Sequence, residues 1–154
     1  MLPTVTGFQS FIYNVMGIDP LVLPSDSPVI GWAFQVAMMI VSPDLAIVAT
    51  ANGTTPATSL YELAVYNLAG DNLVNYAQDQ TGRTYFADLR ASLKINAFAA
   101  GVVTSASDAG TSDSLAVPES LKNLTLSDLQ NLKTPWGRAY LAIAQRYGTL
   151  WGLT

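Results

Sequence analysis

The sequence of 154 residues contains neither cysteine nor histidine. Their absence excludes disulfide frameworks, metal sites built on thiolate or imidazole, cysteine nucleophiles and every histidine-based catalytic triad. An enzyme would have to use carboxylates, a hard cation or a serine–lysine pair, and eleven acids and seven bases offer little to build these from. We therefore expect a protein that is not an enzyme, with no catalytic residue, no metal and no cofactor.

Charged residues are scarce, at 12 % of the chain, and unevenly placed. Residues 1–82 carry six acids and no base, a formal net charge of −6, whereas residues 83–154 carry all seven bases and five acids, a net charge of +2. This asymmetry suits copies that associate head to tail, with the acidic flank of one meeting the basic flank of the next. Seven dispersed bases argue against tight nucleic-acid binding and allow a DNA duplex to pass without sticking.

Two pairs of aspartates share a loop each, Asp19 with Asp26 and Asp108 with Asp113. Neither pair has the spacing of a calcium loop, which needs acids at alternate positions and a distal glutamate. We interpret them as solvated turn formers. The sequence also lacks a Gly-x-x-x-x-Gly-Lys run, so it gives no support for nucleotide binding.

The longest apolar run covers residues 29–41, and the trend resumes over 45–51. Thirteen residues are too few to span a bilayer, and Ser42-Pro43-Asp44 interrupts the longer stretch. We expect a helix buried in protein on nearly all sides, with a membrane-active pore former or holin-like protein as the alternative. Because no basic segment opens the chain as in a secretory signal, we expect it in the cytoplasm at synthesis.

Helix start signals predict one mainly α domain, a bundle of about five to seven helices with its core over about 4–94 and 125–148. The expected helices cover 4–16, 28–41, a short segment from 43, about 60–79, 85–93, a short one from Thr125-x-x-Asp128, and a last one after Thr134-Pro135. Ser59 and Glu62 form a capping box. Ala69-Gly70 offers a place where another helix can approach closely, and Asp88, Arg90 and Lys94 are expected to be solvated.

Residues 96–121 change to glycine, alanine, serine, threonine and aspartate, and the helical period disappears. This composition predicts an extended loop or a hairpin of two short strands around a tip. Its backbone and short side chains suit pairing with neighbouring chains. The residues expected to make those contacts are Val103, Ser105, Ser107, Ser112 and Ser114.

The C-terminal segment 136–154 combines aromatic residues with arginine and has no acidic side chain. That composition is typical of interaction hot spots. The candidate docking residues are Trp136, Arg138, Tyr140, Arg146, Tyr147 and Trp151. The alternative is that these aromatics close the domain's own core, since an amphipathic terminal helix has the same pattern. Gly148 and Gly152 favour a flexible arm at the extreme end.

Three stretches carry a resemblance to a known family: YELAVYNLAGDNLV at 61–74, GVVTSASDAGTSDS at 101–114 and TPWGRAYLAIAQRYG at 134–148. In order and spacing, over about residues 5–150, they resemble the head-to-tail adaptor (connector, head-completion) proteins of tailed bacteriophages. Asn67 would occupy the polar position of that family's long central helix. Ser105 and Ser107 fall one position late, and the low charge and the segment 119–132 leave a sibling role, such as a stopper, open.

The resemblance implies a helical subunit that assembles into a homo-oligomeric ring, typically of twelve copies, beneath the portal protein. It implies that the C-terminal segment docks on the portal and that the hairpin faces the next ring, formed by a downstream neck or tail protein. Genomic DNA would pass through the ring without specific binding. The expected location is the virion neck, with the host cytoplasm during assembly and no membrane contact.

Overall fold

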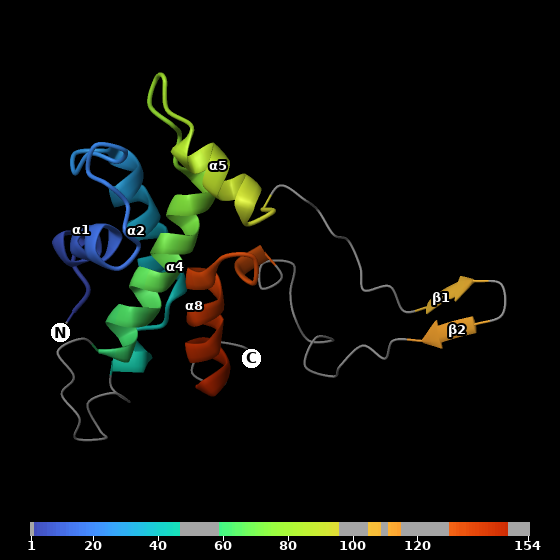
Figure 1. Ribbon diagram of the computed structural model, residues 1–154. Helices are drawn as coiled ribbons and strands as arrows, with labels where there is room; N and C mark the ends of the chain where they lie inside the picture. Colours follow the sequence, from blue (N-terminus) through green and yellow to red (C-terminus); the bar gives the residue numbers. More distant parts are fainter. Residues whose placement is uncertain (1, 47–58, 96–104, 109–110, 115–129, 148–154) are drawn as a thin grey trace.

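The computed structural model describes residues 2–46, 59–95, 105–108, 111–114 and 130–147, and over these it confirms the predicted fold class, a mainly α helical bundle with a small hairpin (Figure 1). The elements are α1 (Val5–Asn14), α2 (Pro28–Ile40), α4 (Leu60–Tyr76), α5 (Tyr85–Ser92), β1 (Ser105–Asp108), β2 (Thr111–Ser114) and α8 (Pro135–Arg146). A further helical turn begins at Asp44. The helix expected from Thr125 lies outside the described residues.

Side-chain caps begin three of these helices, at Ser59 and Thr134 as the sequence predicts and also at Thr4. Thr4, Ser59 and Thr134 each accept a hydrogen bond from the backbone amide three residues later, at 3.0, 3.1 and 2.9 Å. Each cap satisfies an amide that has no partner inside its helix. Helix α2 begins directly after Ser27 with proline in its first turn, also as predicted, but without a side-chain cap bond.

The C-terminal end of α4 differs from the prediction. The helix ends at Tyr76, three residues before the expected boundary. The guanidinium of Arg90, on α5, donates hydrogen bonds to the carbonyls of Val74 at 3.1 Å and Ala77 at 2.7 Å. A cation here also interacts favourably with the negative end of the helix dipole. Arg90 is therefore partly buried as a cap for another helix, and the expectation that it is solvated is wrong.

Helix α4 is the centre of the bundle, with α1, α2, α5 and α8 packed against it (Figure 1). It is buried on nearly all sides, and one hydrophobic cluster joins it to its neighbours. Small residues permit the close packing. A methyl group added at Gly70 would lie 3.1 Å from Sδ of Met16 and 3.5 Å from Cγ of Trp136. The predicted close approach at Ala69-Gly70 is thus confirmed.

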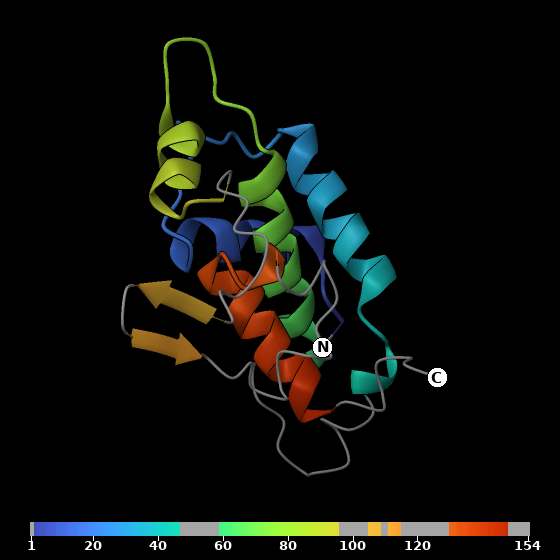
Figure 2. The same ribbon diagram turned by 90° about the vertical axis from the view of Figure 1, so that its right-hand side faces the viewer.

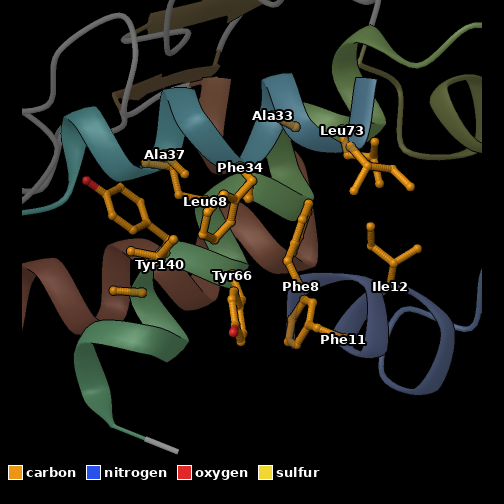
Figure 3. Packing of buried hydrophobic residues seen from close by; sticks show 14 of the residues in the cluster. Phe8, Phe11, Ile12, Ala33, Phe34, Ala37, Tyr66, Leu68, Leu73 and Tyr140 are labelled. Atoms are coloured by element: carbon orange, nitrogen blue, oxygen red, sulfur yellow. The ribbon is translucent and has the colours of Figure 1, made fainter. Parts of the chain in front are cut away.

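Four aromatic rings join α1, α2 and α4 (Figure 3). Phe8, Phe11, Phe34 and Tyr66 form pairs whose ring centroids lie 5.8–6.5 Å apart. Such ring pairs stabilise the fold by more than the burial of their apolar area alone. Because α1 and α2 meet α4 through the same cluster, these helices form one side of the bundle.

Helix α2 is not covered on all sides, and that expectation is wrong. Trp32 is 46 % exposed, Ile40 55 % and Met39 84 %. The helix packs on α4 and α1 with one face, which holds Ile30, Ala33, Phe34 and Ala37, and presents apolar side chains on the other. Within the described residues, the structure contains no helix with both the length and the apolar character to cross a membrane.

The hairpin lies well away from the helices (Figure 1). Strands β1 and β2 pair antiparallel, with Ser105 opposite Ser114 and Ser107 opposite Ser112. The strands expected within 96–121 are therefore present. Figure 2 shows the molecule turned by 90°, so that the side with the hairpin faces the viewer. As these two strands make up the whole sheet in the described part of the chain, each has an open outer edge.

Candidate assembly interface

A buried polar cluster fastens the start of α8 to the middle of α4. Asp71, on α4, is 1 % exposed, and its Oδ1 accepts a hydrogen bond from the hydroxyl of Thr134, the residue that caps α8. The amide of Gly137 donates to the same hydroxyl at 2.9 Å. Asn75 donates to Asp71 Oδ2 at 3.2 Å. One threonine therefore both starts α8 and positions it against α4.

The backbone of α8 lies very close to its neighbours at Gly137. A methyl group there would lie 2.1 Å from the carbonyl oxygen of Asn131 and 2.8 Å from Oδ1 of Asp71. Real Cβ contacts do not occur at such distances, so only glycine fits without movement of the backbone.

The Asp71 carboxyl has no cationic partner in this cluster. Burial raises its pKa to about 6, and the hydrogen bond from Thr134 opposes the rise in part. Desolvation disfavours the charged form of a buried carboxyl, whereas a hydrogen bond donated to the carboxyl favours that charged form. Burial is the larger effect here, so folding favours the neutral acid.

The structure divides the predicted docking residues of the C-terminal segment into two groups. Tyr140 is only 7 % exposed and lies in the core near Ala37 and Leu68 (Figure 3). Trp136 and Tyr147 are partly buried against the same cluster. The alternative that the aromatics close the core therefore describes Tyr140, which cannot act as a surface contact in this fold. Arg138 and Arg146 are exposed, and Trp151 lies outside the described residues.

The exposed residues of α8 form one face, defined here as the α8 outer face: Pro135, Arg138, Ala139, Ala142, Gln145 and Arg146. Their spacing of three and four residues places them on one side of the helix. This face has small side chains at its centre, an arginine near each end and no acid. Arg138 donates to the carbonyl of Leu132 at 3.0 Å, and the Arg146 guanidinium lies 6.0 Å from the ring centre of Tyr147.

Four of the five residues predicted to contact neighbouring chains lie in the hairpin strands. Ser105, Ser107, Ser112 and Ser114 occupy alternate rungs of the ladder, while Val103 lies outside the described residues. The hairpin and α8 are separate in space (Figure 1). The predicted portal contact and the predicted neighbour contact are therefore on different parts of the molecule.

The remaining buried acid, Glu62, is part of the contact between α1 and α4. Its Oε1 accepts a hydrogen bond from the Tyr66 hydroxyl at 3.0 Å, and that hydroxyl accepts from the Thr4 amide at 3.2 Å. Burial is the main cause that raises the pKa of Tyr66.

Asn67, the expected polar position, donates to the carbonyl of Leu63 in its own helix at 2.8 Å. In the described ranges no three acidic residues come together as a metal site would require.

Sequence reasoning missed Asp71, Asp79 and Gly137. Asp79 lies beyond α4, and its carboxylate accepts hydrogen bonds from the amides of Phe86 at 2.7 Å and Ala87 at 2.9 Å, at the start of α5. The hydroxyl of Thr84, which directly precedes α5, donates to Asp88 at 2.8 Å. One signal for Asp71 was available: the acid lies three residues from both Leu68 and Val74, on the apolar side of its helix.

Comparisons with protein-family models, with curated proteins and with solved structures found no match to this chain.

Proposed function

We propose that this chain is a structural subunit of the neck of a tailed phage, a head-to-tail adaptor that forms a ring between the portal and the next neck or tail protein. The observation that carries the proposal is the hairpin β1–β2, which lies apart from the helical bundle (Figure 1). The resemblance of residues 61–74, 101–114 and 134–148 to the adaptor family supports it.

The hairpin supports an assembly role because it has little to stabilise it within one subunit. An isolated two-stranded hairpin is at best marginally stable in water. Its strands are four residues each, and their sequences, SASD and TSDS, hold no large apolar residue. Open strand edges are sites at which another chain can add a strand. Contact with a neighbouring ring would stabilise this element.

Portal docking is assigned to the last turn of α8 and the chain that follows it. Arg146 is exposed there, in the last turn of α8, and has no carboxylate in its own turn. Tyr140 contributes by holding the helix on the bundle, not by touching the partner. The docking surface therefore consists of Arg146 and the segment 148–154, which contains Trp151.

The test mixes the purified protein with the portal protein of the same virus and images the mixture by electron microscopy. We expect portal particles with an added ring of density on one end. Arg146→Ala combined with removal of residues 148–154 should abolish this ring while the helical circular dichroism is unchanged, because hot-spot truncations cost about 2 kcal/mol or more in binding. Portal particles that stay bare at saturating protein concentration contradict the proposal.

A second candidate function, a membrane-active protein, is favoured by one observation, the exposed apolar side chains of α2. Vesicle flotation and dye release separate the two functions. Release of dye by the wild-type protein, lost in Met39→Asp, would favour the membrane function. If the vesicles retain their dye and the protein does not float with them, the result would favour the adaptor function.

A further inference from the structure

The exposed side of α2 is mostly apolar, with Gln35 as its one polar member. The α2 outer face is defined here by Trp32, Gln35, Val36, Met39 and Ile40, whose spacing places them on one side of the helix. Trp32 is held edge-on against Tyr76 of α4, with ring centroids 5.1 Å apart and an interplanar angle of 84°. Large exposed apolar patches of this kind mark interaction surfaces.

Exposed acids flank helix α2 in the chain, and no base is near it in the sequence. Asp26 precedes the helix, Asp44 follows it, and both are exposed. Two such faces could not pack against each other without bringing acids toward acids. An isologous contact between two α2 helices is therefore disfavoured, because like charges at an interface cost binding energy.

The bases lie on the other side of the bundle. Among the described residues, the exposed basic side chains are Arg83, Lys94, Arg138 and Arg146, which all belong to α5, α8 or the chain beside α5. Figure 1 shows α1 and α2 on one side of α4 and α8 on the other. Both α2 and α8 pack along α4, so the fold converts the charge asymmetry of the sequence into two oppositely charged flanks.

The shapes of the two faces are also complementary. The α2 outer face presents the bulky side chains of Trp32 and Met39, which are 46 % and 84 % exposed. The α8 outer face presents Ala139 and Ala142 at its centre, with Arg138 beside them. Large side chains on one helix pack well over small ones on another, because the helix axes can then approach closely.

We infer that the α2 outer face of one copy packs against the first two turns of the α8 outer face of the next copy. This is a heterologous contact, which can close into a ring. The inference rests on the proposed ring, and it identifies the two surfaces that the ring joins. It uses Arg138, Ala139 and Ala142, and leaves Arg146 and the following chain for the portal.

Single cysteines test this contact directly, because the chain has none of its own. Gln35→Cys and Ala142→Cys place a thiol at an exposed position on each face. A mixture of the two variants under mild oxidation should form a covalent heterodimer, at least about tenfold faster than a mixture of Gln35→Cys with Asn14→Cys, an exposed control on α1. Equal rates for the two mixtures, or rapid dimerisation of Gln35→Cys alone, would overturn the inference.

A mixing experiment tests the head-to-tail geometry without cysteine. Met39→Asp disables the α2 outer face and Ala142→Glu the α8 outer face, and both positions are exposed enough to leave the fold intact. The self-association constant of each variant alone should fall about tenfold or more. Met39→Asp loses a Met-sized apolar contact, and Ala142→Glu brings an acid toward the acids that flank α2. Mixed together, they should form a heterodimer in sedimentation velocity, because each retains the face that the other lacks. No heterodimer, or a homodimer of Ala142→Glu, would contradict the contact.

These experiments need no portal, so their outcome is independent of the portal-binding test. A heterodimer without portal binding would leave the contact in place and remove the neck function. Portal binding by both face variants with unchanged affinity and ring size would overturn the contact and leave the neck function standing. Flotation of the wild-type protein with vesicles, lost in Met39→Asp and without any self-association, would assign the α2 outer face to a lipid surface instead.

Discussion

Thr134 donates a hydrogen bond to the carboxylate of Asp71, which lies 63 residues earlier in the chain. Both side chains are almost fully buried, and the same threonine hydroxyl caps α8 through the Gly137 amide. Removal of either partner would leave a buried polar group without its bond, which costs more than the bond itself contributes. The position of the C-terminal helix on the bundle therefore depends on this pair.

The Asp71 carboxyl should make stability depend on pH. Its pKa rises from 3.8 to about 6 on folding, so folding favours the protonated form. The stability that this group contributes is fully present below pH 3.8 and is lost as the pH rises through 6. Between these limits the free energy of unfolding should fall by about 3 kcal/mol. In Asp71→Asn this dependence should disappear. Urea denaturation at pH 7, 5 and 4 measures it, and wild-type and variant stabilities that change in parallel would contradict the assignment.

Gly137→Ala should be strongly destabilising, by about 3 kcal/mol or more, because overpacking against backbone cannot be relieved by rotation of a side chain. The added methyl group would meet the Asn131 carbonyl. Gly31→Ala on α2 is the matched control, since a methyl group there meets no atom within 4 Å. That control should gain up to about 1 kcal/mol from helix propensity. Thermal unfolding of both variants checks the pair, and equal melting temperatures would show that the contact at Gly137 relaxes freely.

Asp79→Ala should loosen the start of α5 without unfolding the bundle. The variant removes the acceptor of two amides, those of Phe86 and Ala87, and loss of a cap costs about 1 kcal/mol. Hydrogen exchange of these two amides should accelerate about fivefold or more, while amides in the middle of α4 keep their rates. Thr84→Ala is the comparison, because its hydroxyl bonds to Asp88 and not to the amides. Equal acceleration in both variants would show that Asp79 is not the cap.

The hairpin should change its hydrogen exchange on assembly. Strands β1 and β2 pair with each other, and in the free subunit their ladder is short enough to open often. Amides 105–108 and 111–114 should therefore exchange rapidly in the free protein and become protected in the assembled neck. Strong protection in the isolated subunit would make the hairpin an ordinary part of the fold and remove its proposed docking role.

Local sequence signals predicted most of the secondary structure correctly. Ser59 and Thr134-Pro135 mark helix starts because a cap is a contact between residues three positions apart, which the sequence displays directly. The small residues at 69 and 70 likewise indicated a close helix approach. The end of α4 was less predictable, because Arg90 caps it from another helix.

The sequence by itself therefore determined where helices begin, the mainly α class and the separation of acids from bases along the chain. The tertiary structure decided that Tyr140 is buried while Arg146 is exposed, that Asp71 faces Thr134, and that Trp32, Met39 and Ile40 of α2 are exposed. The periodicity of a helix shows which residues share a face but not which face meets a partner. That choice depends on contacts between distant segments, here the packing of α2 and α8 along α4, and it places the charge asymmetry on two flanks of one bundle.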